Sequence, residues 1–290
     1  MFEPKISVII PTINRNEILV NTLKDLLKQN YTDFEIIIVD QTENPKKEVL
    51  RFCKKNIKKI KYFQISKKSS PHARNVAVQN ADGDILLFVD DDVEIPGRDF
   101  LKLHADNYKD RKIGLVGGRI VYGDEEPAYQ EVGRLKYWGL KEVTHFDSTV
   151  KTRIDHAAGG NFSCYKSIFV KVGGFNEIYG GNAHMEETDF CLRVKRAGYK
   201  MVFEPKAVLK HLQFKKGGNR VKDLYELRYW LVHNGTVFYL KNFPKILFPL
   251  YFIKQLFWST FSGLKRQDGK MFKTMSKALI KGINYYLKMS

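Results

Sequence analysis

Cysteine is scarce in this chain of 290 residues, which holds only Cys53, Cys164 and Cys191 and no CxxC spacing. An odd number of widely separated thiols indicates neither a disulfide framework nor a thiolate zinc site. The first residues run from a charged start directly into a short apolar strand, without the cleavage site of a signal peptide. We therefore expect a protein of the reducing cytoplasm.

A hydrophobic run long enough to cross a membrane is also missing. The most apolar stretch, residues 246–261, is interrupted by Pro249 and Lys254. It is also shorter than the roughly 20 residues that a spanning helix needs. We expect it to lie peripherally at the inner face of the cell membrane. The alternative is a helix that packs on the core and turns a basic face to water.

Acidic residues are few beside the basic ones, 32 against 49, and the formal net charge is +17. Such an excess draws a protein to nucleic acid, anionic lipid or phosphorylated substrates. Much of it is local, because residues 241–290 carry one acid, Asp268, against ten basic residues: Lys241, Lys245, Lys254, Lys265, Arg266, Lys270, Lys273, Lys277, Lys281 and Lys288. Their position beside an aromatic segment favours an anionic membrane surface as partner. No nucleic-acid-binding motif is present, so we expect no nucleic acid partner.

The first third of the chain alternates short β-branched runs with helical stretches. Strands are expected over 6–11, 34–40 and 84–89, and helices are expected over 17–29, 45–55 and 71–80. This rhythm predicts an α/β fold, with a mostly parallel sheet and helices on both faces. Residues 113–164 are rich in glycine and aromatics and are expected to form substrate-binding loops. We expect a catalytic domain over residues 1–240 and a basic, aromatic-rich helical segment over 241–290.

Polar residues follow three of the expected strands, at the carboxyl ends where ligands bind in open α/β sheets. They are Pro11 and Thr12, Asp40 and Gln41, and Asp90 to Asp92. Three adjacent carboxylates stay together only when they are well solvated or share a cation. After a buried strand, they favour Mn²⁺ or Mg²⁺ bridging to a substrate diphosphate over a solvated acidic turn.

Two further motifs flank these residues. SPHARN, which begins at Ser70, contains Arg74, whose guanidinium suits a phosphate or a base edge. Glycine-rich segments precede the acidic stretch Glu186 to Asp189. Acids before a helix ordinarily stabilise its N-terminus. A mobile glycine-rich approach also suits the delivery of one acid to a cleft as a general base.

Taken in order, these segments resemble the family-2 glycosyltransferases of GT-A fold, from about Lys5 to His211. The matching stretches are SVIIPTINR, IIIVDQT, PHARN, ADGDILLFVDDD, GGNFSCYKS, VGGFNE, EETDFCLRVKRAGYK and VLKH. The resemblance implies an inverting transfer with Mn²⁺ or Mg²⁺ as cofactor and a nucleotide-sugar donor, UDP-sugar by default. It also implies a saccharide or lipid-linked acceptor in the synthesis of a cell-surface polysaccharide or glycoconjugate.

The resemblance also implies residue roles. Asp40 would hold the base, Arg74 would position the nucleotide and Asp91 would sit at the ribose. The implied nucleotide-binding set is Pro11, Thr12, Asn14, Arg15, Asp40, Gln41, Arg74, Asp90 and Asp91. The implied metal ligands are Asp92, Asp90 and His211, the implied catalytic bases are Glu187 or Glu186, and the implied sugar or acceptor pocket is Gly159, Gly160 and Asn161.

Two departures from the family pattern leave alternatives open. Ile13 stands where the family often has an aromatic residue, and Gln41 stands where it often has a second aspartate. The nucleotide base of the donor therefore stays open. Glu186-Glu187 replaces the usual Glu-Asp pair, so either of these two glutamates could be the catalytic base. The competing enzyme class, nucleotidyl transfer onto a sugar phosphate, normally has a glycine-rich basic loop after the first strand. PTINRNE lacks such a loop.

Overall fold

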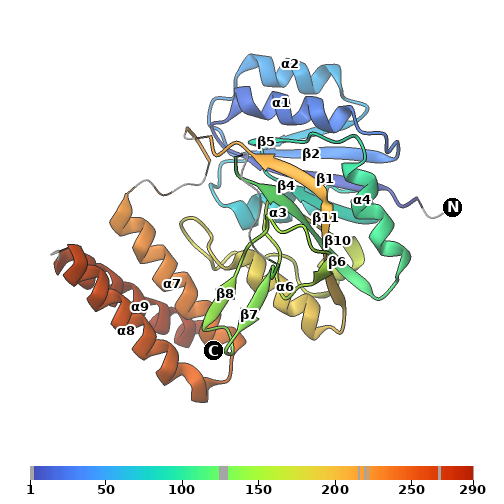
Figure 1. The fold of residues 1–290 in the computed structure, drawn as a ribbon. Helices are drawn as coiled ribbons and strands as arrows, with labels where there is room; N and C mark the ends of the chain where they lie inside the picture. The colour runs from blue at the N-terminus through green and yellow to red at the C-terminus, as the bar shows by residue number, and fades with distance from the viewer. Residues whose placement is uncertain are drawn as a thin grey trace.

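The computed structural model describes residues 3–123, 130–214, 216–218, 221, 223–266 and 269–289. At 259, 262–266 and 289 only the backbone is described. The side chains of Lys265 and Arg266, two of the basic residues counted above, therefore lie outside the described part, as does Asp268. The chain folds into an α/β domain followed by a unit of helices (Figure 1).

Strands and helices alternate through the first half of the chain, as the sequence pattern predicts. In chain order the elements are β1 (Ile6–Thr12), α1 (Asn16–Leu27), β2 (Phe34–Asp40), α2 (Lys47–Lys55), β3 (Ile60–Gln64), α3 (Ser70–Gln79), β4 (Ile85–Val89), β5 (Val93–Glu94), α4 (Phe100–Asp106), the 3-10 turn η1 (Asn107–Lys109), β6 (Ile113–Val121), β7 (Arg134–Lys136), β8 (Lys141–Val143), β9 (Thr152–Arg153), β10 (Asn161–Tyr165), α5 (Lys166–Lys171), α6 (Glu186–Arg196), β11 (Lys200–His211), α7 (Leu224–Asn242), the 3-10 turn η2 (Lys245–Leu247), α8 (Phe248–Arg266) and α9 (Gly269–Met289). The elements expected in the first third are all present, whereas β3 was not expected.

The main sheet is mixed rather than mostly parallel, which corrects the expectation. Its strands run in the order β3-β2-β1-β4-β10-β6-β11-β5, with β9 paired to β11. The first four strands are parallel to one another, as βαβ units require. β10 is antiparallel to both of its neighbours, β4 and β6. A strand that enters the sheet from a distant segment can take either direction, and no local pattern in the sequence reveals which.

The parallel half of the sheet is buried on both faces, because helices cover each side (Figure 1). Alternate residues of a strand point to opposite faces. Ile36 and Ile38 of β2 accordingly join one core cluster, while Ile37 and Val39 join the other. This double burial explains the uninterrupted apolar run of β2. The register pairs Thr12 of β1 with Asp40 of β2, so these strands end at the same edge.

The stretch 113–164 is more regular than the sequence indicates, because β6 and β10 lie inside the main sheet. Glycine is depleted in strands, and three glycines made β6 read as a loop. Two of them have a packing reason. A Cβ on Gly117 would lie 3.1 Å from the Cβ of Ala157, and one on Gly118 would lie 2.4 Å from the amide of Asn161. These glycines let neighbouring segments approach the strand closely.

Helices α7, α8 and α9 pack together beside the sheet domain (Figure 1). Pro249, which interrupts the apolar run in the sequence, does not interrupt helix α8. It lies in the first helical turn, where the missing N–H costs no hydrogen bond. The expected domain boundary at 240/241 falls in the last turn of α7, and we propose a boundary near Asp223, which caps the start of α7. None of the described helices is both long and apolar enough to cross a membrane.

Candidate active site

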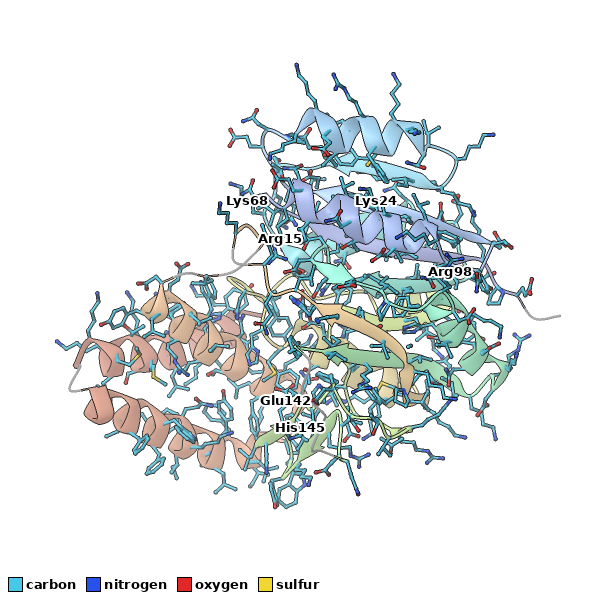
Figure 2. All side chains as sticks on the ribbon, turned by 45° about the horizontal axis from the view of Figure 1, so that its top comes forward. Arg15, Lys24, Lys68, Arg98, Glu142 and His145 are labelled. Carbon is cyan, nitrogen blue, oxygen red and sulfur yellow. The ribbon has the colours of Figure 1, made fainter. Side chains whose placement is uncertain are left out.

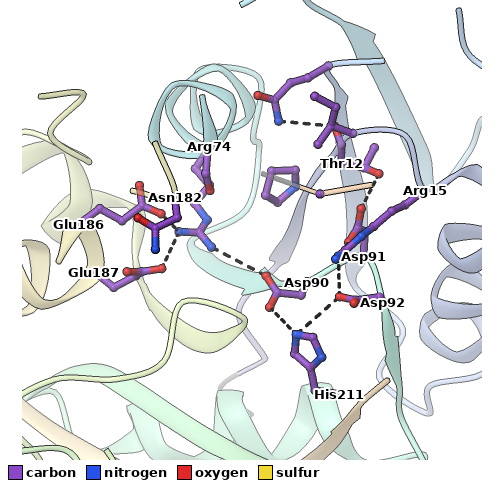
Figure 3. Close-up of a pocket in the computed structure, with 15 residues that line it drawn as sticks. Thr12, Arg15, Arg74, Asp90, Asp91, Asp92, Asn182, Glu186, Glu187 and His211 are labelled. Atoms are coloured by element: carbon purple, nitrogen blue, oxygen red, sulfur yellow. Dashed lines mark hydrogen bonds and ion pairs between the residues drawn. The ribbon is translucent and has the colours of Figure 1, made fainter. Parts of the chain in front are cut away.

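The carboxyl ends of β1, β2 and β4 meet at a cavity of about 240 Å³ (Figure 3). Its walls are formed by Pro11, Thr12, Ile13, Arg15, Gln41, Ser70, Arg74, Asp90, Asp91, Asp92, Asn182, Glu186, Glu187, His211 and Gly218. The structure therefore brings together most of the residues predicted for the site, from segments far apart in the chain. Five predicted residues do not line it: Asn14, Asp40, Gly159, Gly160 and Asn161.

Asp90, Asp92 and His211 form an acidic cluster at one side of this cavity. Nε2 of His211 lies 3.5 Å from Oδ2 of Asp90 and 3.6 Å from Oδ1 of Asp92. One potential ligand atom from each residue lies within 4.8 Å of the others. The backbone N–H of Phe214 donates to Oδ2 of Asp92 at 3.0 Å, which orients that carboxylate. Two carboxylates and one imidazole fit Mn²⁺, and the carboxylates also suit Mg²⁺.

Arg15 is buried and holds two aspartates of the triplet. Its Nη1 lies 2.7 Å from Oδ1 of Asp91 and 2.8 Å from Oδ1 of Asp92. The hydroxyl of Thr12 donates to the other oxygen of Asp91 at 2.6 Å. Burial raises the pKa of Asp91 to about 6, although Arg15 and Thr12 oppose the rise. Both oxygens of Asp91 are thus engaged by residues at the end of β1 and just after it, and the expected contact with a ribose stays a prediction.

Arg74, in α3, links the two sides of the cavity (Figure 3). Its Nη1 donates to Oε1 of Glu186 at 2.5 Å and to Oε1 of Glu187 at 3.1 Å. Its Nη2 donates to the carbonyl of Gly159 at 3.1 Å and lies 3.9 Å from Oδ1 of Asp90. A guanidinium offers several donors in a fixed plane, so Arg74 sets the spacing between the glutamate pair and the acidic cluster.

Glu186 and Glu187 are adjacent in sequence but differ in exposure. The side chain of Glu186 is 2% exposed, and burial raises its pKa well above the usual range, although Arg74 opposes the rise. The side chain of Glu187 is 24% exposed and lines the cavity. A Cβ on Gly159 would lie 1.9 Å from Oε1 of Glu187, so only glycine leaves room for this carboxylate. Glu187 is therefore the member of the pair that a substrate can reach more readily.

Asp40 and Asn14 lie just outside the cavity. One carboxylate oxygen of Asp40 accepts from the N–H of Thr42 at 2.8 Å, and the other accepts from the hydroxyl of Tyr62 at 2.7 Å. Asn14 has a left-handed φ of 55° in the turn after β1, and its N–H donates to the hydroxyl of Thr42. These contacts shape the loops after β1 and β2, and the expected role of Asp40 toward a base stays a prediction.

The segment Gly159 to Asn161 supports the cavity from behind. A Cβ on Gly160 would lie 2.2 Å from Oδ2 of Asp90. Gly159 and Gly160 therefore leave room for the carboxylates of Glu187 and Asp90, respectively. The amide of Asn161 is buried and donates to backbone carbonyls of β6 and β11 at 2.9 and 3.0 Å. Asn161 therefore joins two strands through its amide, and the expected sugar or acceptor pocket at Gly159, Gly160 and Asn161 stays a prediction.

Asn182 and Gly218 line the cavity and were missed from the sequence. Asn182 lies in the glycine-rich loop before α6, and its buried Oδ1 has no hydrogen-bond partner among the described residues. The same loop ends at Met185, whose φ of 77° is unusual for a residue with a side chain. The sequence GGN at 180–182 is the signal from which Asn182 could have been predicted. No sequence signal indicates Gly218. A Cβ on Gly218 would lie 2.7 Å from Nη2 of Arg15.

The helical unit contacts the catalytic segment directly. Asp189, buried in α6, accepts from Nζ of Lys241 at 3.1 and 3.2 Å and from the amide of Asn242 at 2.9 Å. Trp230 of α7 packs on Gly180–Gly181, where added Cβ atoms would lie 2.5 and 2.3 Å from its ring. α7 therefore braces both the helix that begins with the glutamate pair and the loop that precedes it.

Together, the mixed sheet, the acidic cluster after β4 and the facing glutamates define a glycosyltransferase of GT-A fold. A family model described as "Glycosyl transferase family 2" matches residues 7–169, more than half of the chain. The chain belongs to glycosyl transferase family 2, which confirms the resemblance. A second model, described as the N-terminal domain of galactosyltransferase, matches residues 142–216, which include the glutamate pair and His211.

Several curated proteins are similar in sequence. The chain is 29% identical over 224 residues to an uncharacterized protein of Sinorhizobium fredii, covering 72% of this chain and 24% of that protein. It is 27% identical to an O-antigen chain rhamnosyltransferase of Salmonella typhimurium, covering 71% and 66%. It is 36% identical to the GalNAc(5)-diNAcBac-PP-undecaprenol beta-1,3-glucosyltransferase of Campylobacter jejuni, covering 32% and 31%. The matched part of the chain spans about a third or less of the length of the first curated relatives.

Solved structures share the fold. A mannosyltransferase from Pyrobaculum calidifontis in complex with GDP-Man and Mn²⁺ has a TM-score of 0.62 at 16% identity, covering 98% of this chain and 76% of that chain. TarS 1–349 of S. aureus in complex with UDP-GlcNAc has a TM-score of 0.58 at 20% identity, covering 81% and 66%. The likeness to the mannosyltransferase extends into the helical unit, since it covers nearly the whole chain.

Proposed function

We propose that this protein is an inverting, metal-dependent hexosyltransferase that uses a nucleotide-sugar donor. Its acceptor would be a saccharide or lipid-linked glycan in the synthesis of a cell-surface polysaccharide or glycoconjugate. One observation carries the proposal: a single cavity has a metal-type cluster on one side and a reachable glutamate on the other. Arg74 lies between them, 3.9 Å from Asp90 and 3.1 Å from Glu187. Inverting transfer needs these two groups, one for the leaving diphosphate and one for the attacking hydroxyl.

Asp90, Asp92 and His211 are the residues that would hold Mn²⁺ or Mg²⁺. A divalent ion bound there supplies Lewis-acid neutralisation of the charge that develops on a leaving diphosphate. Arg15 pairs with Asp91 and Asp92 from the side of β1, so the proposed ligand Asp92 is positioned before any substrate arrives. The names of two structural neighbours, complexes with GDP-Man and with UDP and GalNAc, include Mn²⁺ and support this choice of ion.

Glu187 takes the proton of the acceptor hydroxyl. As that O–H bond breaks, the oxygen bonds to the anomeric carbon from the face opposite the diphosphate. The bond between this carbon and the diphosphate oxygen breaks, and the nucleotide diphosphate leaves with the electron pair. The configuration at the carbon inverts. Glu186 is buried and its Oε1 accepts from Nη1 of Arg74 at 2.5 Å, so in this proposal it positions Arg74 instead of acting as the base.

The nucleotide would lie against the ends of β1 and β2. Gln41 lines the cavity with its amide engaged: Oε1 accepts from the N–H of Ser69 at 2.6 Å, and Nε2 donates to the carbonyl of Thr12 at 3.4 Å. A UDP-sugar is the default donor, but structural neighbours carry UDP-GlcNAc in one case and GDP-Man in another. A screen of nucleotide sugars for slow hydrolysis with Mn²⁺ would identify the donor.

An apolar surface on the helical unit supports a peripheral position at the inner face of the cell membrane. We name it the α8 stripe; it comprises the exposed residues Ile246, Leu250, Ile253, Phe257, Trp258 and Phe261. Ile246 lies in η2, directly before α8. The other five are spaced mostly three or four residues apart, which places them along one side of α8, while Tyr251 faces the core of the unit. Contiguous exposed apolar surface marks an interaction site. Aromatic, amphipathic helices suit the boundary between head groups and acyl chains.

Positive charge lies on the neighbouring helix. α9 carries an exposed lysine row, which we define as Lys270, Lys273, Lys277, Lys281 and Lys288. Steps of three, four and seven residues place these side chains on one face of a helix. A lysine row beside an apolar stripe favours anionic lipid over nucleic acid, which offers no apolar layer. The Campylobacter relative is named for an undecaprenol-linked acceptor, which supports an acceptor held in a membrane.

The central test replaces each glutamate by its neutral isostere. We expect Glu187→Gln to slow transfer by about 10²–10⁴-fold, because it removes the general base, and to leave nucleotide affinity near normal. Glu186→Gln is the matched control and should retain more activity, since Glu186 is buried against Arg74 and is less accessible to a substrate than Glu187. Transfer rates and nucleotide dissociation constants are measured for both variants with Mn²⁺. An active Glu187→Gln variant would overturn the mechanism.

A further inference from the structure

A second cavity, of about 390 Å³, lies between the helical unit and the catalytic domain. Its volume is within the range of roughly 300–1,000 Å³ that is typical of small-molecule sites. One wall comes from the turn and strand at residues 139–142, and Figure 2 shows Glu142 where this hairpin meets the helices. Another wall is His184 and Met185, directly before the glutamate pair. Helices α7, α8 and α9 complete it.

The lining is largely apolar and aromatic, with an unused polar group. Tyr239 is buried, and its hydroxyl has no hydrogen-bond partner among the described residues. Buried hydroxyls are normally paired, so a ligand with an acceptor atom would satisfy it. Gly235 lies in the interior of α7, where glycine is unfavourable. A Cβ there would lie 2.9 Å from the hydroxyl of Tyr251, and glycine keeps this part of the cavity open.

Two cations also line this cavity. Nζ of Lys254 turns inward to donate to the carbonyl of Leu140 instead of facing water with the α8 stripe. Arg228 lines the same cavity and makes no ion pair with any residue that the structure describes. The acid present, Glu142, is held by the hydroxyl of Thr188 at 3.0 Å and lies 3.4 Å from Nδ1 of His156. The cavity therefore offers more positive than negative charge, within apolar walls.

The position of the cavity connects two surfaces already described. Trp258 belongs both to its lining and to the α8 stripe. Met185 also lines the cavity and directly precedes Glu186 and Glu187, and Thr188, which holds Glu142, lies in the first turn of α6. An amphiphile that enters from the α8 stripe would thus have its polar end close to the segment that carries Glu187.

We propose that this cavity binds the phosphate and the adjoining hydrocarbon of a lipid-linked acceptor. The phosphate would contact Arg228, Lys254 and the hydroxyl of Tyr239, and the chain would run along Trp258 toward the lipid. The proposal rests on the proposed function, because it names the acceptor of the same reaction. It predicts recognition of a phosphate and a hydrocarbon together, and of neither alone.

The test uses the full-length protein and geranyl phosphate as the probe, with calorimetry as the measurement. We expect geranyl phosphate to bind at least tenfold more tightly than geraniol or inorganic phosphate. The double variant Arg228→Gln/Lys254→Gln should lose at least tenfold in affinity for geranyl phosphate. Lys54→Gln/Lys55→Gln, on the exposed end of α2, is the matched control and should bind it normally. Gly235→Leu is a second variant, designed to fill the cavity, and should abolish binding.

Thermal unfolding of each variant shows whether it has folded. Equal binding of geraniol, equal binding of inorganic phosphate, or normal binding of geranyl phosphate by the folded double variant would each overturn the proposal. Hydrolysis of nucleotide sugars by the unmodified protein is measured separately. Its absence with every donor would overturn the proposed function, whereas donor hydrolysis without geranyl phosphate binding would overturn this inference alone.

Discussion

The catalytic domain and the helical unit depart from the usual distribution of side chains in opposite directions. The catalytic domain buries charge: Arg15, Arg74, Asp91, Asp92 and Glu186 are all less than a tenth exposed. The helical unit instead exposes apolar side chains along the α8 stripe. Most soluble proteins avoid both features, because buried charge costs desolvation free energy and exposed apolar patches promote association. We propose that each departure marks a place where the protein meets a ligand.

The two departures also predict different sensitivities. In the catalytic domain the charges form one network, so the loss of a single member leaves its partners buried and unpaired. In the helical unit, each side chain of the α8 stripe would contribute separately to the proposed burial in lipid. A single substitution should therefore stop the chemistry, while membrane binding should decline in steps.

The largest expected effect is in the acidic cluster. Asp92→Asn should lower transfer by on the order of 10³-fold, since loss of metal ligation removes several kcal/mol from transition-state stabilisation. The amide has nearly the same shape, so the hydrogen bond from the N–H of Phe214 and the fold should persist. Rates with Mn²⁺ and thermal unfolding are measured together. Full turnover in excess EDTA would show that the cluster binds no essential metal.

A smaller effect is expected in the α8 stripe. Ile253→Gln/Phe257→Gln should reduce partition into anionic vesicles by about 10²-fold, because burying each such side chain contributes about 1.5–3 kcal/mol. Ile57→Gln is the matched control, since Ile57 is 73% exposed but lies on the catalytic domain. Vesicle co-sedimentation measures both variants, and donor hydrolysis should be unchanged in the control. Equal sedimentation of the unmodified protein and both variants would show that α8 is a packed helix that does not bind lipid.

The smallest effect is expected in the lysine row. Lys273→Gln/Lys277→Gln should weaken binding to anionic vesicles by roughly 30-fold at low salt, at about 1 kcal/mol per lysine. The loss should shrink as salt rises, because salt screens exposed charges. Binding to neutral vesicles should not change. Duplex DNA retention of the same proteins is the comparison: tighter binding to DNA than to anionic vesicles would favour nucleic acid as the polyanion.

Local sequence patterns predicted the features that depend on residues close together in the chain. The apolar runs of β1, β2 and β4 specified buried strands, and the position of Asp90 to Asp92 after β4 specified the edge of the sheet. Where a local pattern misled, tertiary packing had reversed its meaning. The glycines of β6 suggested a loop, but Gly117 and Gly118 are there because they let Ala157 and Asn161 approach the strand closely.

Contacts between distant residues could not be predicted in the same way. Arg15 and Asp91 are 76 residues apart, and Arg74 and Glu186 are 112 residues apart. The role of Arg74 at the nucleotide stays a prediction, and the local pattern did not reveal that Arg74 pairs with Glu186 and Glu187. The direction of β10 and the turn of Asp40 toward Tyr62 likewise depend on the assembled sheet. A motif can place a residue at a site, but the pairings within that site come from the fold.

The brace between α7 and α6 has a consequence for the choice of acceptor. Lys241 and Asn242 tie the catalytic helix to a rod of 19 residues, about 28 Å long, that also packs on the helix carrying the α8 stripe. If the α8 stripe rests on lipid, as proposed, this brace would hold the active-site cavity at a fixed distance from the bilayer. Acceptors whose terminal hydroxyl reaches that distance would then be preferred over shorter or longer ones.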